Sequence, residues 1–239
     1  RLREGYHEEL GLGSCSIAGS EHKAFSRAAA FMNGTISHIA EFDDIFRDGA
    51  YHPACPTVSA AFALAQTRNL SVKELLAAII IGYEVSTRIS KVIQPSHYRY
   101  FHTTGTAGVF GAAAACSHLL GLRATQACDA LATAGTFASG LQQAFRSDSM
   151  TKPMHAGHAA DPMRCRARDS AGARARCAVG VLSGLRCGGR AVCDLAARVA
   201  RHYRRARMAQ ERHRPARGGR AHSPALRRVC PGTQRVRAI

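Results

Sequence analysis

The sequence has no tryptophan, few other aromatic residues and no long hydrophobic run. Its most apolar stretch, residues 107–122, is interrupted by His118 and is shorter than the roughly 20 residues that span a bilayer. A secretory signal is not visible either, because residues 1–9 are polar and no apolar segment follows them. These absences predict a soluble protein that does not act in a membrane.

No C-x-x-C pair occurs among the nine cysteines. That absence argues against a zinc ribbon and against a thioredoxin-type motif. An odd number of scattered cysteines, in a chain without a secretory signal, is typical of reduced thiols in the cytosol. The cysteines therefore predict a cytoplasmic location.

Lysine and phenylalanine are missing from residues 161–239, where 20 arginines face four acidic residues. Residues 1–160, in contrast, are nearly neutral. The apolar runs of the later part are too short and isolated to offset the entropy of ordering the chain. We therefore predict a folded domain over residues 1–160 and an Arg-rich tail that is disordered or translated out of frame. GC-rich alanine codons read one base off would give this arginine bias.

Residues 1–160 have the apolar spacing and alanine content of helices, and nothing in them alternates as a strand would. A capping-box pattern from Ser71 to Glu74 marks one helix start. We expect helices over residues 21–40, 57–67, 72–93, 105–120 and 125–145, and a further one from residue 155. Gly34 indicates either a close helix approach or a helix break. The sequence thus predicts an all-α, bundle-like domain of five or six helices.

Charged side chains concentrate between His38 and Pro53. This segment holds two histidines and four carboxylates, namely His38, Glu41, Asp43, Asp44, Asp48 and His52. We expect it at the end of a helix and in the following loop, facing a cleft. A basic, histidine-rich group follows at His102 and over residues 152–158. Carboxylates from one loop facing imidazoles and an ammonium from others would make a proton-transfer site.

Several motifs together resemble the MmgE/PrpD family, which includes 2-methylcitrate dehydratases and cis-aconitate decarboxylases. The resemblance covers residues 21–160 and rests on AAAFMNGTISHIAEFDD, HP, AAIIIGYEVSTRIS, RYFHTTGTAGVFGAAAACSHLLGL and TKPMHAGHAA. It implies a large helical domain, a smaller α/β domain that closes over the site, a homodimer and no required cofactor or metal. Family members break a C–O or C–C bond of a small polycarboxylate. This chain is shorter than the family's usual length, so we expect a fragment.

The resemblance places the family's site positions on Glu41, Ile45, His52, His102 and Lys152. Decarboxylases of the family have aspartate at the first of these positions and threonine at the second. The hydroxyl is therefore lost here, and the acid is changed conservatively. These two departures count against cis-aconitate decarboxylation and favour a generic dehydratase of the family or an uncharacterised member.

Dehydration of a β-hydroxy acid needs a base, cations and an acid. The base removes a proton next to a carboxylate, cations stabilise the resulting enediolate, and the acid protonates the departing hydroxyl. Lys152 is the expected clamp for a substrate carboxylate. We expect His102 and His52 to bind substrate and to exchange protons near neutrality, where imidazole titrates.

The acidic residues have alternative roles. Glu41 or Asp44 would orient a histidine or act as the base, and Asp43 would bind substrate. Asp43 and Asp44 would otherwise cap the loop or pair with Arg47. His155 and His158 lie three residues apart on one helical face, where we expect packed structural residues.

Three alternatives stay open. Oxygen and nitrogen atoms that could bind a metal come from His38, Asp43, Asp44 and His52, but their spacing matches no closed zinc pattern, so we expect no metal. The tail would attract phosphate, yet it has a single aromatic residue, Tyr203, and matches no nucleic-acid-binding module. An inactive remnant is the third. The prediction is a metal-independent lyase that dehydrates or decarboxylates a small di- or tricarboxylate such as 2-methylcitrate.

Overall fold

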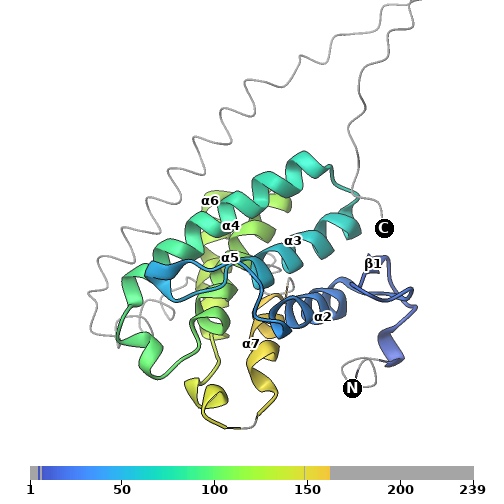
Figure 1. Ribbon diagram of the computed structural model, residues 1–239. Helices are drawn as coiled ribbons and strands as arrows, with labels where there is room; N and C mark the ends of the chain where they lie inside the picture. The colour runs from blue at the N-terminus through green and yellow to red at the C-terminus, as the bar shows by residue number, and fades with distance from the viewer. Residues whose placement is uncertain (1–4, 6, 148, 162–239) are drawn as a thin grey trace, which may run out of the picture.

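The computed structural model describes Gly5, residues 7–147 and residues 149–161 (Figure 1). Its α-helices are α2 (Ser26–Ile39), α3 (Ala54–Arg68), α4 (Val72–Ile93), α5 (Thr103–Leu119), α6 (Ala124–Thr136) and α7 (Thr151–Ala159). Short 3-10 turns are η1 (His7–Glu9), η2 (Arg47–Gly49), η3 (His97–Arg99) and η4 (Gln142–Phe145). The predicted all-α class is confirmed for this part of the chain. The predicted Arg-rich tail lies outside the described residues, apart from Asp161.

Helix α5 is the centre of the domain and contacts α3, α4, α6 and α7 (Figure 1). Every residue from Thr103 to Ser117 is buried. The sequence explains this position, because α5 is made almost wholly of small and apolar residues and has no polar face to turn to solvent. Gly82 of α4 meets Gly111 of α5 so closely that a Cβ at Gly82 would lie 2.7 Å from the Gly111 carbonyl oxygen. These helices therefore pack backbone to backbone.

Helix α4 follows its local sequence closely. The Glu74 amide donates to Ser71 Oγ at 3.3 Å and the Ser71 amide donates to Glu74 Oε2 at 2.8 Å, so the predicted capping box is present. The expected end at Ile93 is also confirmed. Near its end the apolar Val92 is 45% exposed, whereas the polar Ser90 is buried. The turn η2 packs against Ser90 through Gly49 and thereby covers a polar position.

Two helix boundaries move because of tertiary contacts. The first expected helix starts five residues late, since Lys23–Ala24 (β2) pairs antiparallel with Cys15–Ser16 (β1). The helix expected over residues 125–145 ends at Thr136. Beyond it the chain turns back, and the Gly140 carbonyl accepts a hydrogen bond from the His102 amide at 2.9 Å. Pairing with Phe101 and His102, just before α5, thus replaces the last turns of that predicted helix.

Two other helices start earlier than expected. Helix α3 begins at Ala54 instead of residue 57, and α7 begins at Thr151 instead of residue 155. Both have a proline in the first turn, Pro56 and Pro153, where the missing amide hydrogen has no intrahelical acceptor to lose. The segment before Lys152 is therefore a loop, but Lys152 itself lies on a helix.

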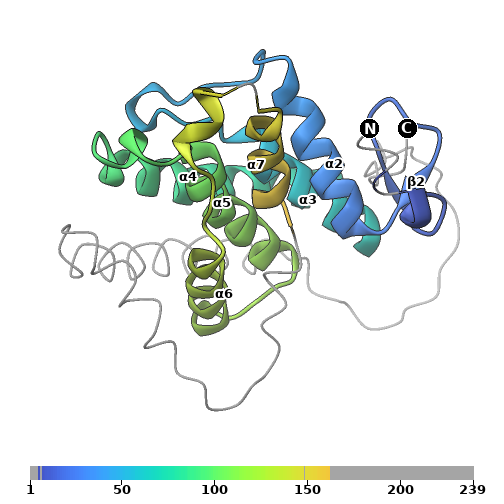
Figure 2. The same cartoon turned by 90° about the horizontal axis from the view of Figure 1, so that it is seen from below.

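Helices α2 and α7 lie side by side (Figure 2). A Cβ at Gly34 would lie 3.1 Å from the Gly157 Cα, and a Cβ at Gly157 would overlap Thr35 Oγ1 and the Phe31 carbonyl. Gly34 therefore marks a close helix approach and not a break. Through this contact, the start of α7 is fixed over the loop that follows α2.

No helix within residues 7–147 or 149–161 is long and apolar enough to cross a membrane. The cysteines of this part form no disulfide; they are Cys15, Cys55, Cys116 and Cys128.

Candidate active site

Three segments that are far apart in sequence meet at one end of α5. They are the loop after α2 (residues 40–53), the start of α5 and the first turn of α7. The His38 and His102 rings stack with centroids 5.4 Å apart, and the His52 amide donates to Thr104 Oγ1 at 3.3 Å. Lys152 forms an ion pair with Glu41. The predicted site residues are thus brought into one cluster.

His38 and His52 share the carboxylate of Asp43. His38 Nδ1 donates to Asp43 Oδ2 at 2.9 Å, and His52 Nδ1 lies 3.5 Å from the same oxygen. His38 is fully buried, and only 7% of the Asp43 side chain is exposed. Burial lowers the pKa of His38, and the neighbouring Asp43 opposes that shift only in part. His38 is therefore a neutral donor that holds Asp43 in place.

His52 is oriented by the backbone of Asp44. Its Nδ1 donates to the Asp44 carbonyl oxygen at 2.9 Å, while Asp44 Oδ1 accepts from the Ala54 amide at 3.0 Å. The Asp44 carboxylate thus satisfies a free amide at the start of α3. Because Nδ1 is engaged, Nε2 is the nitrogen of His52 left for substrate.

His102 faces a histidine of α7. The two Nδ1 atoms of His102 and His155 lie 3.1 Å apart. His102 is only 2% exposed, and mainly this burial lowers its pKa to about 2. Burial also lowers the pKa of His155. The expectation that His102 exchanges protons near neutrality is therefore wrong, because the sequence does not show how deeply the ring is enclosed.

Phe145 of η4 supports both Lys152 and His102. Lys152 Nζ lies 4.7 Å above the Phe145 ring centroid, and the His102 ring meets Phe145 edge to face with centroids 4.8 Å apart. Glu41 lies just beyond the C-cap of α2 with a left-handed φ of 53°, which costs about 1–2 kcal/mol for a residue with a side chain. Backbone strain of this kind is common where a side chain must be aimed at a functional site.

Not every predicted acidic residue joins the cluster. Asp48 instead pairs with Lys91 of α4 at 2.7 Å, on the surface. Ile45, at the position where decarboxylases have threonine, is 57% exposed. Phe145 belongs to the cluster but was not indicated by the sequence. His38 was indicated only as part of the charged segment and as a possible metal ligand, and His155 only as part of the histidine-rich group and as a packed residue. The spacing of His38 three residues before Glu41 was one available signal, whereas nothing local to Phe145 indicates its contacts.

A metal site is still an alternative at part of the cluster. His38, Asp43 and His52 each offer one ligand atom, and these atoms lie within 4.8 Å of one another. Two nitrogens and a carboxylate oxygen form a donor set that suits several divalent metals. Asp44 does not complete it, since its carboxylate is bound to the Ala54 amide. The expected absence of a metal stays a prediction.

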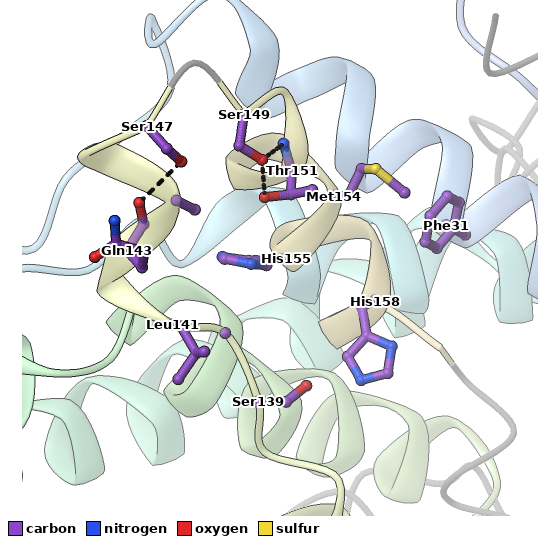
Figure 3. Close-up of a pocket in the computed structure, with 12 residues that line it drawn as sticks. Phe31, Ser139, Leu141, Gln143, Ser147, Ser149, Thr151, Met154, His155 and His158 are labelled. Carbon is purple, nitrogen blue, oxygen red and sulfur yellow. Dashed lines mark hydrogen bonds between the residues drawn. The ribbon is translucent and has the colours of Figure 1, made fainter.

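A cavity of about 590 Å³ opens next to the cluster, and His155 forms part of its wall (Figure 3). His155 and His158 line it from α7, together with Leu141 and Gln143 from the segment before α7. Ser149 and Thr151 also face it and hydrogen-bond to each other at 2.7 Å. The His102–His155 pair therefore connects the buried cluster to an open, largely apolar space that also holds a few hydroxyl groups.

Known proteins match the same part of the chain. The cis-aconitate decarboxylase of Homo sapiens is 36% identical over 138 residues, which cover 55% of this chain and 28% of the human protein. That of Aspergillus terreus is 32% identical over 155 residues, which cover 62% of this chain and 31% of the fungal protein. The match thus spans less than a third of either relative. Residues 2–162, which hold the whole cluster, match the MmgE/PrpD N-terminal domain, and the chain therefore belongs to the MmgE/PrpD family.

Proposed function

We propose that the cluster serves a lyase that acts on a small di- or tricarboxylate without a metal. The observation that carries the proposal is the meeting of one ammonium, Lys152, with imidazoles and carboxylates from separate segments. Family membership supports lyase chemistry, and the relatives are named for decarboxylation. The substrate and the bond broken are proposals for this chain.

Lys152 is the proposed clamp for a substrate carboxylate. Its side chain is 22% exposed and already holds one carboxylate, that of Glu41, whose side chain is 48% exposed. A substrate carboxylate would take the place of Glu41, which is free to swing into solvent. The Phe145 ring under the ammonium limits the approach to the opposite side. A charge-assisted contact of this kind stabilises the enediolate that forms when the adjacent carbon loses its proton.

His52 is the proposed base. Its Nδ1 proton is held by the Asp44 carbonyl and lies near Asp43, so the lone pair of Nε2 is free. The carboxylate of Asp43 would stabilise the imidazolium that forms when Nε2 takes a proton. In this role His52 removes the proton from the carbon next to the clamped carboxylate.

His102 is the proposed neutral donor. Because its pKa is lowered to about 2, it carries no charge at pH 7 and cannot act there as an imidazolium. A neutral imidazole can still donate one hydrogen bond to an oxygen on which negative charge develops. This donor and Lys152 would share the charge of the enediolate.

Dehydration of a β-hydroxy acid such as 2-methylcitrate is the first proposed reaction. The C–H electron pair forms the new double bond, and the hydroxyl leaves as water with one proton from an acid. Decarboxylation of cis-aconitate is the second, and the names of the relatives favour it. There the C–C electron pair stays on carbon as carbon dioxide leaves, and a proton is added. Glu41 and Ile45, which replace the aspartate and threonine of decarboxylases, favour the first.

Product analysis by NMR would test the proposal. The purified 239-residue chain is incubated separately with 2-methylcitrate, citrate and cis-aconitate. We expect turnover of at least one, lowered at least 100-fold in Lys152→Ala. Lys91→Ala removes an exposed lysine on α4 and should leave the rate within about twofold. A folded chain that converts none of the three, or a Lys152→Ala variant with full activity, would overturn the proposal.

A further inference from the structure

We propose that His155 is a positioning residue: its Nδ1–H donates to His102 Nδ1, and His102 is thereby held as the tautomer that presents Nε2–H to the substrate. This inference rests on the proposed function for the role of the Nε2–H group. The hydrogen bond itself can be tested without turnover. It assigns a purpose to a residue that the sequence indicated only as a packed histidine.

The two rings face each other through the same atom, Nδ1, at 3.1 Å. A hydrogen bond between two such nitrogens needs one protonated and one unprotonated partner. The two rings therefore cannot choose their tautomers independently. Whichever ring donates from Nδ1 fixes the other as the Nε2–H form.

Both rings are held so that this contact persists. The His102 amide donates a hydrogen bond to the Gly140 carbonyl oxygen, and the His102 and Phe145 rings pack edge to face. His155 lies where two glycines leave space: a Cβ at Gly140 would lie 3.1 Å from His155 Nδ1, and one at Gly105 would lie 3.0 Å from His155 Cβ. Gly140 also has a φ of 131°, which other residues rarely adopt. The absence of side chains at these two glycines thus leaves the space that the His155 side chain occupies.

The surroundings of the two rings differ. His38 stacks on the His102 ring and Phe145 meets its edge, so His102 is only 2% exposed. His155 lines the open cavity, where water can donate a hydrogen bond to its Nε2. We therefore assign the Nδ1 proton of the pair to His155, whose Nε2 lone pair then has a partner in water, and His102 accepts at Nδ1.

The result is an uncharged ring with a fixed polarity. His102 accepts at Nδ1 and must carry its single proton at Nε2, the nitrogen away from His155. Without the donor from His155, the neutral ring could place its proton on either nitrogen. In the wrong tautomer, His102 would present a lone pair to a developing oxyanion and would repel it.

The tautomer can be read directly. Long-range ¹H–¹⁵N correlation spectra of the ¹⁵N-labelled chain at pH 7 should show His102 as the Nε2–H form. In His155→Ala, a second population with Nδ1–H should appear. His155→Asn keeps an amide near the position of Nδ1 and should restore most of the original form. His158→Asn, the control on the same helix, should leave the His102 signals unchanged.

Activity gives the second readout. We expect His155→Ala to lower kcat at least tenfold with KM within about twofold, and His155→Asn to recover most of kcat. Nδ1–H on His102 in the unmodified chain would overturn the inference without any variant, and so would an unchanged tautomer in a folded His155→Ala. The expected tautomers in a chain without turnover would overturn the proposed function and leave the His155 hydrogen bond standing.

Discussion

Lys152 forms an ion pair with Glu41, a residue 111 positions earlier in the chain. The pair joins the first turn of α7 to the loop after α2. If Lys152 is the clamp for substrate, Glu41 is a competitor that occupies it at rest. Glu41 then stabilises the resting protein through the ion pair but weakens the binding of substrate.

Substitution Glu41→Gln should therefore tighten the binding of a carboxylate. An exposed ion pair is worth up to about 1 kcal/mol, so the Kd for tricarballylate should fall about two- to fivefold. Calorimetric titration at low and high salt would measure this. The control Glu84→Gln, which removes the partner of Arg88 on α4, should not change the Kd. Weaker binding in Glu41→Gln would mean that Glu41 itself contacts the ligand.

Acidification should destabilise the domain through its buried imidazoles. Burial lowers the pKa of His38, His102 and His155 below the value of about 6.5 in an unfolded chain. The folded state then binds fewer protons than the unfolded state, so this stability is complete above pH 6.5 and is lost as the pH falls below it. Urea unfolding at pH 7.5 and pH 5 should show a lower midpoint at pH 5.

The same burial predicts a flat NMR titration for His102. Its Cε1–H shift should stay constant between pH 8 and pH 4, because the pKa of about 2 lies below that range. A midpoint near pH 6.5 would show that water reaches the ring. It would also restore the role in proton exchange that the sequence suggested.

Substitution Gly157→Ala should destabilise the chain. The new methyl group would overlap Thr35 Oγ1 and the Phe31 carbonyl, and overpacking of this kind costs about 1–3 kcal/mol. Gly5→Ala adds a methyl group in open space and serves as the control. Urea unfolding would compare the two variants. Equal stability would show that α2 and α7 can separate without loss.

Treatment with a metal chelator should have no effect on the thermal stability of the chain. His38 Nδ1 and His52 Nδ1 already donate to Asp43 and to the Asp44 carbonyl, so a metal would have to replace both hydrogen bonds. EDTA should leave the thermal midpoint unchanged, and Co²⁺ should give no visible absorption band of a protein-bound ion. A cobalt band that disappears in Asp43→Asn would instead establish the metal alternative.

Local signals predicted the parts of the fold that local forces determine. The start of α4 follows from hydrogen bonds between Ser71 and Glu74, which lie within one turn, and it was found correctly. The end of α6 was missed because it depends on Gly140 meeting His102, a contact across separate segments. Periodicity alone carries no information about such a partner.

The candidate site divides in the same way. The resemblance to the MmgE/PrpD family indicated Glu41, His52, His102 and Lys152, and the structure places all four together. Their protonation was not accessible, because burial of His102 arises only after α2, α5 and η4 pack around it. The support from Phe145 was missed for the same reason.

The close contact between Gly34 and Gly157 has a consequence for synthesis on the ribosome. The carboxylates of the cluster emerge more than 100 residues before the lysine that neutralises one of them. A nascent chain whose α7 is still inside the ribosome therefore has Glu41 in place without the lysine that neutralises it. Glu41 gains its counter-ion only when Gly157 docks against α2, so α7, the last helix of the described residues, is the one that completes the site.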